Sequence, residues 1–113
     1  MSYLLDTNVI SEIRKGPRCH PDVARWYAAV EEDDLYLSAL VPGEIRRGIE
    51  KARSQDPVKA ESLERWLGEL LEAFDGYIVP IDREIAEEWG RLSAGRSLPV
   101  VDSLLAATAK VRT

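Results

Sequence analysis

Three short apolar runs constrain the fold of this chain more than any other feature. They occupy residues 3–5, 35–37 and 77–81, and segments with helical patterning separate them. Strands that alternate with helices are typical of a parallel sheet, because each parallel strand needs a crossover connection to the next. We therefore predict an α/β fold in which helices cover a parallel sheet. A length of 113 residues fits one domain, residues 1–113.

Apolar residues spaced by three and four predict helices between these runs. The predicted helices span residues 9–15, 21–31, 40–53 and 58–74, another is capped by Asp82, and the last begins near Asp102. The helix at 58–74 carries the clearest apolar stripe, formed by Leu63, Trp66, Leu67, Leu70, Leu71 and Phe74. Such a stripe packs either in the core or against a second copy of the chain.

Asp6 is the first candidate for chemistry, because it directly follows the first apolar run. Open α/β sheets bind their ligands at the carboxyl ends of their strands, which is where Asp6 would lie. A structural role is equally compatible with the local sequence. Asp6, Thr7 and Asn8 are all residue types that cap helix N-termini. Other acids must decide between the two interpretations.

Two further carboxylates, Glu44 and Asp102, lie near the starts of predicted helices. Each has a structural explanation, because an acid there gains about 0.3–1 kcal/mol from the helix dipole. Segments that follow parallel strands nevertheless gather at one edge of the sheet, so the three acids are expected to share a cleft. Bare carboxylates 4 Å apart would repel by about 4 kcal/mol per pair at an effective dielectric constant near 20, which a bound cation relieves. Oxygen ligands without His or Cys suit Mg²⁺ or Mn²⁺ rather than zinc, and indicate metal-dependent phosphodiester cleavage.

Charge and composition limit the alternatives. The net charge of -5 argues against a basic nucleic-acid surface, but clustered carboxylates can recruit cations that meet phosphate. The single Cys19 and single His20 lie in a Pro- and Gly-containing turn, so we expect neither a disulfide nor a catalytic dyad. No apolar stretch approaches the ~20 residues that cross a bilayer, and no secretory signal is evident. We expect a cytoplasmic protein without a membrane partner.

Three segments around the acids resemble the PIN-domain nucleases, and most closely their VapC-type toxin branch. They are Leu-Leu-Asp-Thr-Asn-Val-Ile-Ser at 4–11, the stretch from Leu37 to Ile49, and Leu-Pro-Val-Val-Asp-Ser-Leu-Leu-Ala-Ala-Thr-Ala at 98–109. The resemblance runs in the family's order along the whole chain. It implies a PIN-like three-layer α/β/α fold and a metal-dependent endoribonuclease, the toxin of a type II toxin-antitoxin system. It also implies a homodimer and a VapB-like antitoxin partner.

The resemblance carries roles to individual residues. Asp6, Glu44 and Asp102 match the family acids that hold Mg²⁺ or Mn²⁺ and activate water for RNA cleavage. Thr7 and Asn8 match polar residues that help to set the first acid or a metal-bound water, although Asn8 is also a candidate helix cap. Two further candidates, Arg46 and Arg47, follow Glu44 and could contact RNA phosphate or remain solvated helix charges.

The chain departs from the family pattern at its end. Family members continue past the last helix into a further strand, a turn that carries another acid, and a final strand, and no such sequence follows Thr113. We therefore expect one open edge on the first strand. Two alternatives to the nuclease stay open. One is a non-catalytic PIN-like domain that binds antitoxin or RNA without cleavage, and the other is a receiver-like phosphoryl-transfer domain.

Overall fold

The computed structural model describes residues 2–112. Strands and helices alternate along the chain, which confirms the α/β prediction. The elements are β1 (Tyr3–Leu5), α1 (Thr7–Arg14), a 3-10 helix (Gly16–Arg18), α2 (Pro21–Ala29), a 3-10 helix (Glu32–Asp34), β2 (Leu35–Ser38), α3 (Leu40–Arg53), α4 (Pro57–Ala73), β3 (Ile78–Val79), α5 (Arg83–Ser93) and α6 (Val100–Arg112).

The three strands form one parallel sheet in the order β1-β2-β3. Leu37 in β2 is paired with Leu5 in β1 and with Ile78 in β3, so β2 is the central strand. Within residues 2–112, β1 is paired on one side only, as expected. The third strand is shorter than the predicted 77–81, because Pro80 has no N–H to extend the hydrogen-bond ladder.

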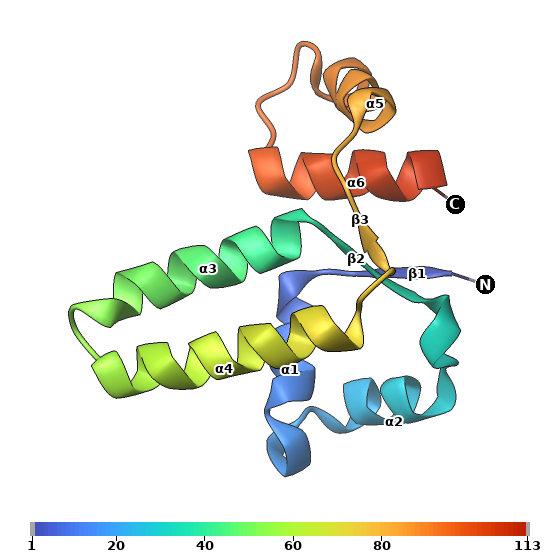
Figure 1. The fold of residues 1–113 in the computed structure, drawn as a ribbon. Helices are drawn as coiled ribbons and strands as arrows, with labels where there is room; N and C mark the ends of the chain where they lie inside the picture. Colours follow the sequence, from blue (N-terminus) through green and yellow to red (C-terminus); the bar gives the residue numbers. More distant parts are fainter. Residues whose placement is uncertain (1, 113) are drawn as a thin grey trace.

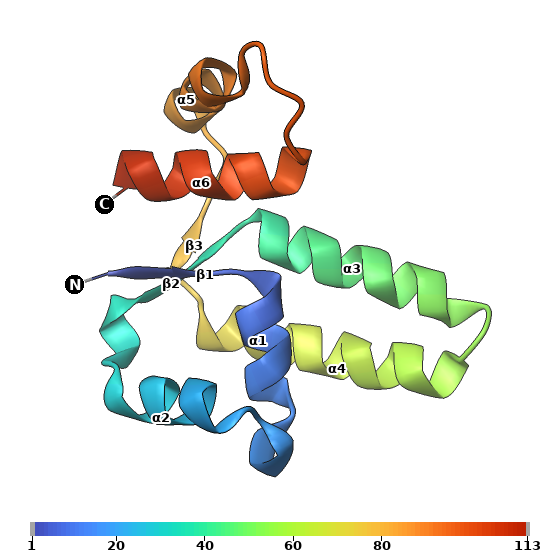
Figure 2. The ribbon, with the colours of Figure 1, turned by 180° about the vertical axis from the view of Figure 1, so that it is seen from behind.

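Helices cover both faces of the sheet, which confirms the three-layer arrangement. Figure 1 and the reverse view in Figure 2 show α1, α2 and α4 on one face and α5 with α6 on the other. Helices α3 and α4 form an antiparallel hairpin that extends away from the sheet. Helix α3 has the predicted bounds, whereas α2 ends at Ala29, two residues earlier than predicted.

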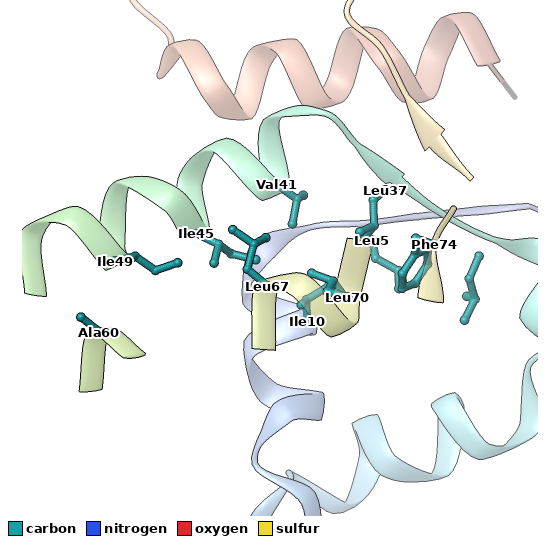
Figure 3. Packing of buried hydrophobic residues seen from close by; sticks show 11 residues of the cluster. Leu5, Ile10, Leu37, Val41, Ile45, Ile49, Ala60, Leu67, Leu70 and Phe74 are labelled. Atoms are coloured by element: carbon teal, nitrogen blue, oxygen red, sulfur yellow. The ribbon is translucent and has the colours of Figure 1, made fainter. Parts of the chain in front are cut away.

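The main hydrophobic core lies between the sheet and the layer of α1 and α4. Alternation along the strands points Leu5, Leu35 and Leu37 into this layer. Figure 3 shows Leu5 of β1 and Leu37 of β2 together with buried residues of α1, α3 and α4. The buried cluster comprises Leu5, Ile10, Leu35, Leu37, Val41, Ile45, Ile49, Ala60, Leu67, Leu70 and Phe74. The stripe of α4 is thus largely core, although Leu71 remains 39% exposed.

Helices α5 and α6 pack mainly against each other and form a second, smaller unit, called here the α5–α6 pair. Its buried residues include Ile85, Ala107 and Thr108. The Trp89 indole Nε1–H donates to Ser103 Oγ at 3.0 Å and joins the two helices. None of the helices among residues 2–112 has the length and apolar character needed to span a membrane.

Candidate active site

Asp6 lies between the end of β1 and the first turn of α1. Its backbone is extended, with φ -92° and ψ 173°, and its Oδ1 accepts a hydrogen bond from the Val9 amide at 2.9 Å. Asp6 is therefore the N-cap of α1 and also lies at the carboxyl edge of the sheet. The two sequence interpretations are compatible, because a carboxylate has a second oxygen that the cap does not use.

Glu44 is held in place by Thr7. The Thr7 hydroxyl donates to Glu44 Oε1 at 2.5 Å and joins the start of α1 to α3. We expected Thr7 to set the first acid or a metal-bound water, and its hydrogen bond goes instead to the second acid. Helix α3 begins at Leu40 as predicted, and Glu44 is its fifth residue, so Glu44 lies near the helix start but just beyond the first turn. A helix-dipole role for Glu44 is weakened accordingly.

Asp102 is exposed in the first turn of α6 and lines a pocket together with Asp6. This acid pocket has a volume of about 350 Å³ and is lined by Leu4, Leu5, Asp6, Asp102, Leu105, Ala106 and Ala109. The first and third predicted acids therefore come together from opposite ends of the chain. Glu44 does not line the acid pocket. It is linked to Asp6 through the next residue, Thr7, whose hydroxyl donates a hydrogen bond to it.

The acids offer carboxylate oxygens, which hard cations prefer as ligands, but the three acids do not all lie around one position. Among residues 2–112, no group of three His, Cys, Asp or Glu side chains is arranged to hold a metal ion. Asp6 and Asp102 offer carboxylate oxygens to one pocket, which suits Mg²⁺ or Mn²⁺. Two carboxylates are a sufficient protein contribution for Mg²⁺, which usually keeps several waters.

The remaining candidates take different roles. Asn8 is exposed in the first turn of α1 and is not its cap, because Asp6 is. Arg46 forms two hydrogen bonds with Glu64 of α4, at 2.7 and 2.5 Å, and these raise the pKa of Arg46 and lower that of Glu64. Arg47 is exposed and lines a hollow next to Glu44. His20 accepts a hydrogen bond from the Asp22 amide and caps α2.

The PIN domain family profile matches residues 3–112, nearly the whole chain. The chain belongs to the PIN-domain family. This membership favours the nuclease interpretation over the receiver-like one. The family also accounts for the parallel sheet with helices on both faces.

Curated relatives of this PIN domain carry VapC and toxin names. It is 41% identical to Ribonuclease VapC14 of Mycobacterium tuberculosis over 66 residues, which cover 58% of this chain and 63% of that protein. It is 33% identical to Toxin FitB of Neisseria gonorrhoeae, over 95% of this chain and 79% of FitB. It is 35% identical to VapC ribonuclease Y4jK of Sinorhizobium fredii, over 94% and 78%.

Solved structures agree with the fold of this PIN domain. The structure of FitAB bound to an IR36 DNA fragment superposes with a TM-score of 0.78 at 32% identity, covering 96% of this chain and 78% of that chain. The crystal structure of FitAcB from Neisseria gonorrhoeae also gives 0.78, at 34% identity, covering 95% and 79%.

Sequence reasoning did not identify every residue of this PIN domain that surrounds the acids. Lys51 lines the same hollow as Glu44 and Arg47 and was not selected. The signal was present in the sequence, because Lys51 follows Arg47 by four residues and shares its helix face. The bond from Thr7 to Glu44 had no such signal, since 37 residues separate the two.

Proposed function

We propose that this PIN domain is a metal-dependent endoribonuclease and the toxin of a VapBC-type toxin-antitoxin pair. The observation that carries the proposal is the acid pocket, which Asp6 and Asp102 both line. Glu44 lies close by, because it accepts a hydrogen bond from Thr7, the residue after Asp6. The names of the relatives VapC14, Y4jK and FitB support the activity and the toxin role.

In this proposal, Asp6 and Asp102 hold Mg²⁺ or Mn²⁺, and Glu44 completes the acidic set. When bound, such an ion lowers the pKa of water and neutralises charge on the phosphodiester. The protein contributes orientation. The cap bond to the Val9 amide fixes one oxygen of Asp6, and the Thr7 hydroxyl fixes one oxygen of Glu44. Both carboxylates are therefore already ordered before the reaction begins.

The proposed partners are an RNA substrate, a VapB-like antitoxin and a second copy of the chain. The likeness to FitAB and FitAcB supports a protein partner. Dimerisation has weaker support from the structure, because Leu67, Leu70 and Phe74 of the α4 stripe are buried within the chain. The cytoplasmic location also stays a prediction.

The decisive experiment separates the two roles of Asp6. Asn caps helices about as well as Asp, so Asp6→Asn keeps the bond to Val9 but removes the charge. RNA cleavage should require Mg²⁺ or Mn²⁺, stop with a chelator, and fall at least about 100-fold in Asp6→Asn, since a metal-ligand interaction contributes several kcal/mol. The melting temperature should change little.

Asp56→Asn is the matched control. Asp56 caps α4 by accepting a bond from the Lys59 amide at 3.1 Å, and it does not line the acid pocket. This variant should keep full cleavage. RNA cleavage that survives chelation would exclude the metal mechanism. Equal losses of cleavage in Asp6→Asn and Asp56→Asn would show that Asp6 acts only as a helix cap.

A second candidate function is binding of antitoxin or RNA without cleavage. It is favoured by the position of Glu44, which does not line the acid pocket with Asp6 and Asp102. Calorimetric titration with Mn²⁺ distinguishes the two functions. Saturable binding that is lost in Asp6→Asn supports the nuclease, whereas antitoxin capture without Mn²⁺ binding or cleavage supports the non-catalytic domain.

A further inference from the structure

Helix α3 separates its basic residues onto two faces. One face meets α4, where Arg46 bonds Glu64 through both terminal nitrogens and Arg53 bonds Glu50 and Glu64 at 2.9 and 3.3 Å. These two arginines already have carboxylate partners. A nucleic acid that engaged them would first have to break those ion pairs.

The other face of α3 carries Arg47 and Lys51, which are exposed and have no ion pair within residues 2–112. They line a hollow of about 600 Å³, called here the α3 hollow. Other lining residues are Gly43, Glu44, Gly48 and Val101. A Cβ added at Gly43 or Gly48 would meet no atom within 4 Å, so the glycines leave open space beside the two cations.

The α3 hollow adjoins the acid pocket at two points. Glu44 lines the hollow and is bonded to Thr7, the neighbour of Asp6. Val101 lines the hollow, whereas the next residue, Asp102, lines the acid pocket. Figures 1 and 2 both show the first turn of α6 beside the N-terminal part of α3. A strand whose phosphate lies at the acids can therefore continue into the hollow.

We propose that Arg47 and Lys51 hold phosphates of the RNA strand on one side of the cleaved bond and direct that strand along α3. This inference rests on the proposed nuclease function and adds the path of its substrate. The chain has a net charge of -5 and three acids at its site, so an anionic substrate needs local positive charge to approach. Arg47 and Lys51 lie next to the acids, have no ion pair within the described residues, and supply this charge.

The arrangement along the helix suits a polyanion. Residues four apart lie on one helix face and are displaced by about 6 Å along the axis, so Arg47 and Lys51 present successive charges in a line that leads away from Glu44. Contacts with phosphate position the RNA backbone and do not distinguish one base from another. The α3 hollow should therefore affect RNA affinity and not sequence preference.

The test compares two double variants with the same change in charge. Arg47→Gln with Lys51→Gln removes the proposed phosphate contacts. Arg53→Gln with Lys59→Gln is the control, because Arg53 already pairs with Glu50 and Glu64, and Lys59 is exposed in the first turn of α4, outside the α3 hollow. Circular dichroism checks that both variants are folded.

Binding is measured by fluorescence anisotropy of a labelled single-stranded RNA 12-mer, with Asp6→Asn in every protein to prevent cleavage. The Arg47/Lys51 variant should bind at least about tenfold more weakly. The slope of log affinity against log salt should fall by about 1.4, since each phosphate contact on a single strand contributes about 0.7. The control should match the parent in both measurements.

Equal weakening in both variants would overturn the inference, because it would show a general charge effect. Unchanged RNA affinity in the Arg47/Lys51 variant would also overturn it. If that variant instead loses only capture of an acidic protein partner, the hollow binds protein and not RNA. Because binding is measured without cleavage, a protein that binds RNA through the hollow but never cleaves it refutes the nuclease proposal, whereas the path of bound RNA along α3 still stands.

Cleavage kinetics in the background with native Asp6 give a second readout. The Arg47/Lys51 variant should raise KM about tenfold and keep kcat within about twofold, since the contacts lie outside the reacting bond. A fall in kcat with unchanged KM would contradict a role in substrate binding. Lys51→Glu should weaken RNA binding more than Lys51→Gln, whereas Lys59→Glu should match Lys59→Gln.

Discussion

The body of the molecule, formed by the sheet with α1 to α4, differs from the α5–α6 pair in how it is held together. The body buries aliphatic side chains from its strands and from α1, α3 and α4, and Leu37, Val41 and Ile49 are completely inaccessible. The pair buries few apolar groups and relies on polar contacts. Its buried Glu88 binds Lys110 at 3.0 Å and Arg91 at 3.2 Å.

The candidate site is divided between these two regions. Asp6 and Glu44 belong to the body and are held by the bonds to Val9 and from Thr7. Asp102 belongs to the pair and is exposed on the first turn of α6. A pocket of about 230 Å³ also separates α6 from the sheet, lined in part by Leu4 and Thr108. The position of the third acid therefore depends on a weaker packing unit than that of the first two.

The largest expected effect comes from the body. Leu37→Ala removes a completely buried side chain from the central strand and should lower the free energy of unfolding by about 2–5 kcal/mol. Urea denaturation followed by circular dichroism measures it. Leu71→Ala, at a position 39% exposed, is the control and should cost clearly less. Similar costs at the two positions would contradict the assignment of Leu37 to the main core.

A smaller effect is expected from Trp89→Phe in the α5–α6 pair. It keeps the aromatic packing but removes the bond to Ser103, which should cost about 0.5–1.5 kcal/mol. Hydrogen exchange should accelerate in α6 more than in α3, because the two regions have separate buried clusters. Equal acceleration in both helices would show that body and pair open as one unit.

The smallest expected effect is the pH dependence of the pair. The Lys110 ammonium, followed by Arg91, holds the pKa of Glu88 below its ordinary value of 4.5. The ionised form is favoured by folding, so its contribution is complete above pH 4.5 and is lost as the pH falls through the lowered pKa. Exchange protection of α6 should decrease in that acid range in the native protein. In Glu88→Gln, this acid-dependent decrease should be smaller, and an unchanged profile would exclude Glu88 as its source.

Much of the fold follows from local pattern. The bounds of α3 and the presence of all three strands were predicted correctly, because hydrophobic spacing and strand length reflect which face of each element is buried. The third strand was predicted too long, since its apolar pattern continues past Pro80 although its hydrogen bonding does not.

The sequence by itself determined which donor atoms the candidate site can offer, since it supplies three carboxylates behind strands or near helix starts and no second His or Cys. Tertiary structure alone decided their partners. It placed Asp102 in the pocket of Asp6, bonded Thr7 to Glu44, paired Arg46 with Glu64 and left Arg47 without an ion pair to any residue from 2 to 112. The reason is physical: pattern reports which face of an element is buried, whereas a contact across 37 or more residues depends on how complete elements pack.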